Sequence, residues 1–215
     1  MVTGLPLPSK QGYYQVIAFD GGGTTGWAHF IVDSRVFADP RKHVADFIWR
    51  WSTGEFEGTP HEIYTAAIDL VHRARYGKMP FLGHVAVVAE DFDLVQTVGG
   101  EDLLTVPKFN AVLAYECDKQ FGLEVDFQKR TLRLGVTPDR LNLMGLDSPW
   151  NNKGRWSKSA IPGKDSFAAM QHGITKLKRV KRRADERPWT DHDMRNGQFS
   201  YPITGRGNKV RATRT

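Results

Sequence analysis

Three acidic residues occupy positions where a fold could gather them around divalent metal ions. Asp20 and Glu90 each close an apolar segment, and Asp165 lies in the first turn of an expected helix. A carboxylate at the end of a buried strand is costly unless its charge is compensated. Mg²⁺ is a natural compensator, because hard cations bind oxygen ligands and keep waters for chemistry. Two such ions about 4 Å apart can hydrolyse a phosphodiester, so we expect the three acids to bind metal and to be catalytic.

Each acid also has an explanation that needs no metal. Asp20 precedes Gly21, Gly22 and Gly23 and could be an ordinary turn residue. Glu90 could be a solvent-facing acid, and the helix dipole favours Asp165 whatever its function. Only the joint placement of the three favours a metal site, and bare glycine backbone beside Asp20 would let a phosphate approach closely.

Basic residues extend from the expected acidic site. Lys129 and Arg130 directly follow an expected strand and Arg133 is close behind, so they could bind phosphates or stabilise charge in a transition state. Equally, they could be ordinary surface residues. The last helix continues from Asp165 into further candidates for DNA binding, namely Lys176, Lys178, Arg179, Lys181, Arg182 and Arg183.

Two tryptophans lie in a polar, basic stretch that lacks the pattern of a buried segment. Trp150 and Trp156 are candidates for stacking on unpaired bases. The alternative is that they pack this loop onto the domain.

The charge of the whole chain favours a polyanionic partner. The net charge is +6, with seven Lys or Arg against two acids in 176–187 and four more Lys or Arg in 206–215. Such clustering suits binding to nucleic acid through its phosphates. The 40% hydrophobic content indicates a folded core, and no apolar run is long enough to span a membrane. Cys117 is the only cysteine and 1–10 lack a signal-peptide pattern, so we expect a cytoplasmic protein.

The elements that position these residues follow an α/β order. Strands are expected over 13–20, 24–32 and 44–53 as a meander, then over 84–89 and 123–127. Helices are expected over 60–76, with Thr59 as its N-cap, over 103–121, over 138–146 and from 164 to about 183. We therefore predict a five-stranded mixed sheet flanked by helices. The domain would span 13–183, after an N-terminal arm (1–12) and before a basic, flexible tail (184–215).

Three motifs resemble those of the RuvC-type Holliday junction resolvases, members of the RNase H-like superfamily. Residues 17–28 (IAFDGGGTTGWA) resemble the first motif, an apolar strand, an aspartate and a glycine-rich hairpin. Residues 87–92 (VVAEDF) resemble the second, in which the glutamate binds metal, and 164–172 (KDSFAAMQH) resemble the final helix. Residues 136–141 (VTPDRL) are similar to a segment of bacteriophage members, which would place the protein in a host cytoplasm.

The resemblance implies an RNase H-like fold, Mg²⁺-dependent cleavage of four-way DNA junctions, with Mn²⁺ able to substitute, and a homodimer. One departure concerns the final helix. The family has an acid or histidine one turn before the last aspartate, where this chain has Pro162. Asp91, Asp93 or His172 could complete the metal shell instead, since His172 lies seven residues after Asp165 on the same helical face.

Other functions remain open at this level. A catalytically lapsed DNA-binding module would bind junctions without cutting them. A sugar-kinase or actin-like phosphotransferase uses a similar aspartate-glycine hairpin for nucleotide phosphates, but needs a second lobe and a second phosphate motif that are not found in 215 residues. A related nuclease for RNA–DNA hybrids or flaps is the third alternative.

Overall fold

A five-stranded mixed sheet forms the centre of the computed structural model, which describes residues 13–33, 44, 48–77, 84–92, 104–137, 140–141, 146 and 164–186. β1 (Tyr13–Asp20), β2 (Thr25–Asp33) and β3 (Ile48–Phe56) form an antiparallel meander. β4 (His84–Glu90) pairs parallel with β1, and β5 (Val125–Gln128) pairs parallel with β4. The order across the sheet is β3-β2-β1-β4-β5. This topology confirms the predicted α/β, RNase H-like fold class.

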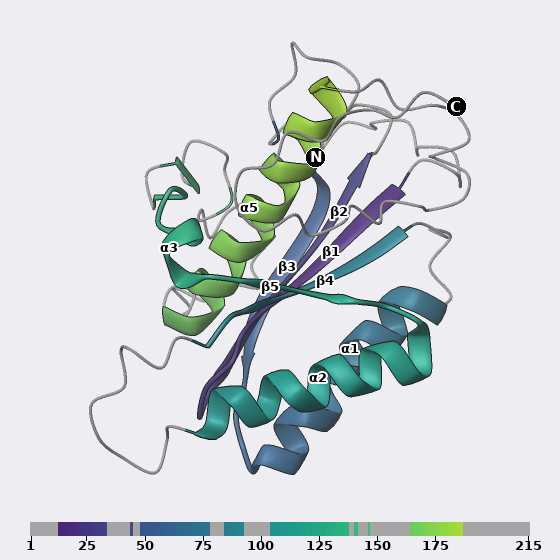
Figure 1. Cartoon of the computed structure of the whole chain (residues 1–215), viewed down its shortest axis with the longest axis vertical. Helices are drawn as coiled ribbons and strands as arrows, with labels where there is room; N and C mark the ends of the chain where they lie inside the picture. The colour runs from purple at the N-terminus through teal and green to yellow at the C-terminus, as the bar shows by residue number, and fades with distance from the viewer. Residues whose placement is uncertain are drawn as a thin grey trace, which may run out of the picture.

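Helices cover both faces of the sheet (Figure 1). α1 (Pro60–Tyr76) and α2 (Thr105–Phe121) pack side by side on one face, and α5 (Lys164–Glu186) lies across β1 and β2 on the other. A four-residue helix, α3 (Arg130–Arg133), follows β5 and contacts α5. Within the described part of the chain, no helix has the length and apolarity needed to cross a membrane.

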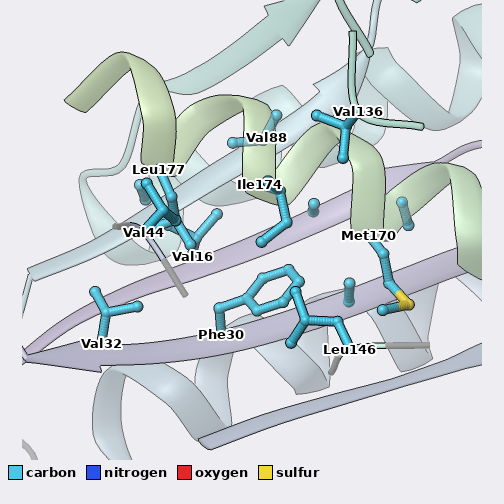
Figure 2. Close-up of a cluster of buried hydrophobic side chains, with 14 of the residues drawn as sticks. Val16, Phe30, Val32, Val44, Val88, Val136, Leu146, Met170, Ile174 and Leu177 are labelled. Atoms are coloured by element: carbon cyan, nitrogen blue, oxygen red, sulfur yellow. The ribbon is translucent and has the colours of Figure 1, made fainter. Parts of the chain in front are cut away.

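The core between the sheet and α5 depends on strand alternation. Val16, Phe30 and Val88 point from their strands toward Met170 and Ile174 of the helix, and all five are buried (Figure 2). A second apolar cluster on the opposite face packs α1 and α2 against the alternate residues of the same strands. Because successive side chains of a strand point to opposite faces, the parity of each position decides which layer its side chain joins.

A tight contact fixes the height of α5 above the sheet. A Cβ at Gly173 would lie 2.4 Å from the Phe30 ring, so no larger residue fits there without moving the helix or the ring. The glycine therefore lets the helix approach the sheet more closely than a side chain would allow.

The start of α1 confirms the predicted cap. Thr59 accepts a hydrogen bond from the Glu62 backbone, and the Glu62 side chain accepts one from the Thr59 backbone, which completes a capping box with Pro60 at the first helical position. These hydrogen bonds lower the pKa of the Glu62 carboxyl.

Other boundaries differ from the expectation. β3 was expected over 44–53, but it begins at Ile48 and runs to Phe56, and Val44 lies in a separate helical turn. The strand extends past Gly54 because Gly54, Glu55 and Phe56 pair with β2, and this partner outweighs the local preference of glycine. α5 continues three residues beyond Arg183. Of the helix expected over 138–146, only Arg140, Leu141 and Leu146 lie in the described part. The arm lies outside it, as does the expected tail from residue 187 onward, whereas 184–186 belong to α5.

Candidate metal centre

Strand register places three polar side chains at the same edge of the sheet. Phe19 pairs with Ala89, so Asp20 and Glu90, one residue further on, end their parallel strands at the same level. Glu90 in turn pairs with Gln128 of β5. Asp20 and Glu90 share the parity of Val16 and Val88, which contact α5. Alternation therefore directs both acids toward the helix.

α5 supplies the third member of the centre. One ligand atom each from Asp20, Glu90 and His172 lies within 4.8 Å of the other two. The imidazole of His172 is fully buried, and its Nε2 lies 3.0 Å from Oε2 of Glu90. Two carboxylates and an imidazole at this spacing fit a divalent transition metal or Mg²⁺. The two carboxylates suit Mg²⁺ or Mn²⁺, and the imidazole adds a ligand that is typical of transition metals.

Burial sets the electrostatics of the two acids. Burial, followed by the charge and the hydrogen bond of Glu90, raises the pKa of Asp20 to about 8. For Glu90, burial opposes ionisation, but hydrogen bonds with His172 and Asp20 and the charge of Arg133 outweigh it and lower the pKa. The pair therefore shares one proton, held by Asp20, and a bound cation would favour its release.

Arg133 lies inside this centre. Its Nε is 3.1 Å from Oε2 of Glu90, and both side chains are mostly buried, with exposed fractions of 12% and 18%. Its Nη1 also lies 3.5 Å from Oε1 of Gln171 on α5. We expected Arg133 to bind phosphates or to stabilise charge in a transition state, and the structure pairs it with an acid of the centre. No local pattern predicted the four-residue helix α3 that carries it.

Gln128 was missed by the sequence reasoning. It is fully buried, its Nε2 lies 3.5 Å from a carboxylate oxygen of Asp126, and its Oε1 lies 3.3 Å from Nδ1 of His172. The amide oxygen therefore accepts a hydrogen bond from Nδ1–H of His172, which leaves Nε2 directed at Glu90. A second hydrogen bond of this kind orients a metal-binding histidine. An uncharged residue at the end of an expected strand carried no signal for this role.

Of the remaining acidic candidates, Asp165 and Asp91 are not members of the three-residue cluster. Asp165 is near enough for its charge to raise the pKa of Asp20, but it is not a member of the group within 4.8 Å. A Cβ at Gly26 would lie 2.0 Å from the Asp165 carbonyl carbon, so this glycine lets the start of α5 approach β2. Asp91 donates its backbone N–H to Gln128, and Asp93 lies outside the described residues.

The glycines after Asp20 have packing roles that the sequence did not indicate. A Cβ at Gly21 would lie 2.9 Å from the ring of Phe109, so that position is closed by the core. A Cβ at Gly23 would meet nothing within 4 Å. Of these two positions, only Gly23 leaves the space that we expected for an approaching phosphate.

The basic candidates differ in how far they are exposed and in the acids that lie near them. Lys129 and Arg130 are exposed where α3 begins. Nζ of Lys176 lies 2.9 Å from Asp126, and Arg179 lies 3.8 Å from the same carboxylate. Lys181 is only 9% exposed, which leaves little of it for a DNA strand to contact. Arg182 and Arg183 belong to α5, and Trp150 and Trp156 lie outside the described residues.

Comparison with known proteins gives likenesses of structure. No family model and no curated protein sequence matches the chain. One similar structure is that of Thermus thermophilus RuvC in complex with a Holliday junction substrate, at 13% identity and a TM-score of 0.45, covering 80% of this chain and 97% of that one. A second T. thermophilus RuvC structure is 13% identical, with a TM-score of 0.43 and coverage of 75% and 92%.

The yeast mitochondrial Holliday junction resolvase Ydc2 is similar at 12% identity and a TM-score of 0.38, with 84% of each chain covered. All three are distant likenesses of backbone. The chemistry of this chain therefore depends on its own side chains.

Proposed function

We propose that the chain is a metal-dependent endonuclease that cuts branched DNA in the manner of a Holliday junction resolvase. The observation that carries the proposal is the convergence of Asp20, Glu90 and His172 within 4.8 Å, at the ends of β1 and β4 and beneath α5. All three also lie in the segments that resemble resolvase motifs. The preference for branched DNA rests on that resemblance.

The residues present fit a bound divalent ion. Asp20, Glu90 and His172 would hold it, and Asp165 would add negative charge nearby. The raised pKa of Asp20 fits this role, because a bound cation would stabilise the ionised form of a carboxyl that burial keeps protonated. Mg²⁺ is the proposed ion, with Mn²⁺ as a substitute. When bound, such ions activate water and stabilise the leaving oxygen of a phosphodiester.

The protein's other groups bind and orient the substrate. Gln128 fixes the imidazole of His172, and Arg133 supplies a positive charge next to Glu90 that can face a phosphate as negative charge develops on it. Lys129 and Arg130 hold the strand beside the centre, and the basic residues of α5 extend the contact away from it. Because two strands must be cut to resolve a four-way junction, two copies of the chain would act together.

The direct test is a cleavage assay with defined substrates. Purified protein is mixed with a labelled four-way junction, a flap, a linear duplex and an RNA–DNA hybrid, each with Mg²⁺, Mn²⁺ or EDTA. We expect cuts in the junction with either metal and none in EDTA. Cleavage of only the hybrid or only the flap would support a nuclease but would assign it a different substrate. Tight junction binding without cleavage under any metal would identify a lapsed DNA-binding module instead.

A further inference from the structure

A basic pocket lies beside the candidate metal centre, between α5 and the segment that follows α3. Leu132, Val136 and Arg140 line one side, and Thr175, Lys178 and Arg179 line the other. Gln171 joins the two sides, because its side-chain amide donates to the carbonyl oxygen of Val136 at 2.6 Å. The pocket is therefore built on a buried hydrogen bond between the two segments.

The charge of the pocket suits an anion. Three of its lining residues are cations, and none of its described lining residues is acidic. Arg140 donates to the carbonyl oxygen of Gly135 at 2.7 Å, and Arg179 is 3.8 Å from Asp126. Lys178 has no ion pair among the described residues, and burial together with the charge of Arg140 lowers its pKa. An anion between these cations would relieve their repulsion.

The pocket wall is apolar as well as basic. Val136 is buried, and Leu132 exposes 46% of its surface beside the three cations. A nucleotide presents both matching features, since its phosphate is charged and its sugar ring offers an apolar face. An inorganic anion would use only the cations.

The distance to the metal centre is set by α5, which carries both His172 and Lys178. Six residues of helix separate them, an axial distance of about 9 Å. One strand of B-form DNA advances roughly 3.4 Å per nucleotide along the duplex axis, so the pocket lies within a few nucleotides of the metal centre.

We propose that the pocket binds a backbone phosphate of the DNA strand that is cut at the metal centre, within a few nucleotides of the scissile phosphate. The inference rests on the proposed nuclease function. It adds Arg140, which the sequence did not single out, to Lys178 and Arg179 as a phosphate-binding group.

The test combines protein variants with neutral phosphates. The cleavage position is first mapped with wild-type protein and Mg²⁺. Single methylphosphonates, which lack the negative charge, are then placed at each of the five linkages on either side of it. Binding is measured by fluorescence anisotropy in EDTA for wild type and for the double variant Arg140→Gln, Lys178→Gln. Lys119→Gln, which removes one positive charge from α2 on the opposite face of the sheet, is the control for a loss of charge away from the pocket.

We expect one linkage within a few nucleotides of the cut to be coupled to the pocket. A methylphosphonate at that linkage should weaken binding several-fold for wild type and Lys119→Gln but not for the double variant. The slope of log K against log salt should be smaller for the double variant than for wild type by about 1 or 2. If the losses of binding free energy from the methylphosphonate and from the double variant are additive at every linkage, the pocket holds no phosphate and the inference is overturned. If wild type neither binds nor cuts DNA, the nuclease proposal itself fails.

Discussion

The imidazole of His172 lies 3.0 Å from the carboxylate of Glu90, although 82 residues separate them in the sequence. This contact joins α5 to the end of β4 and makes the position of the helix part of the candidate metal centre. It also places a nitrogen donor among carboxylates, so the centre differs from a purely acidic one. The predictions below test the members of this centre separately.

Removing either carboxylate should stop cleavage and leave binding intact. We expect Asp20→Asn or Glu90→Gln to lower the rate of junction cleavage about 100-fold or more, because each removes a metal ligand. Binding in EDTA should be equal or tighter, since repulsion between carboxylate and phosphate is reduced. Glu57→Gln, at an exposed acid beyond β3, is the control and should cleave normally. Equal rates in all four proteins would rule out the proposed site.

The buried carboxyl of Asp20 should make the metal-free protein less stable as the pH rises. Its pKa is about 8 in the folded chain against an ordinary value of 3.8, so between these limits the unfolded state binds fewer protons and stability falls with increasing pH. In EDTA, the melting temperature of wild type should drop between pH 5 and pH 8. Asp20→Asn should flatten the drop, whereas Asp118→Asn, at an exposed position, should not. An identical drop of the melting temperature in wild type and both variants would show that other titrating groups cause it.

Gln128 should control the orientation of His172 without touching metal itself. Gln128→Leu removes the acceptor of the Nδ1–H bond, so Mn²⁺ affinity measured by calorimetry should fall about 10- to 100-fold. Nitrogen NMR of the metal-free protein should show Nδ1 of His172 protonated in wild type and protonated to a smaller extent in the variant. Gln128→Glu keeps an acceptor and should retain most of the affinity. Gln120→Leu, an exposed glutamine of α2, controls for the change in polarity, and an effect as large as that of Gln128→Leu would contradict the role.

Two glycines of the first hairpin should respond differently to alanine. A Cβ at Gly26 would overlap the backbone of Asp165, so Gly26→Ala should cost roughly 1–3 kcal/mol in unfolding free energy. It should also reduce cleavage by displacing the start of α5. Gly23→Ala introduces a Cβ with nothing within 4 Å and should change neither quantity by much. Denaturant unfolding and the junction assay measure both effects, and equal stability of the two variants would show that α5 does not depend on this contact.

Local signals explain which parts of the fold could be predicted. The start of α1 followed from Thr59 and Pro60, and the capping hydrogen bonds join Thr59 to Glu62, only three residues further on. β4 followed from a continuous apolar run, because a strand buried on both faces needs no polar side. The limits of β3 depend instead on its pairing with β2 and on a register shift between Ile31 and Val32, which no local pattern in β3 records.

The candidate site was predictable only in part for the same reason. Asp20 and Glu90 end apolar strands, and His172 shares a helical face with Asp165, so their types and spacing marked them as candidates. The pairing of Arg133 with Glu90 joins segments 43 residues apart through a helix of four residues. Gln128 enters through the register of β5 with β4. Both depend on tertiary packing, which composition and periodicity do not encode.

The contact between Gly173 and Phe30 ties the chemistry of this chain to its folding. Gly173 directly follows His172, so any residue that lifts the helix off Phe30 also moves a proposed ligand away from its partners. Substitutions at this point of the core would abolish activity before they unfold the chain. In a mutational scan, the positions in this stretch of α5 at which substitutions reduce folding would therefore also be positions at which they reduce activity. A substitution chosen to stabilise the core here would also change the candidate metal centre.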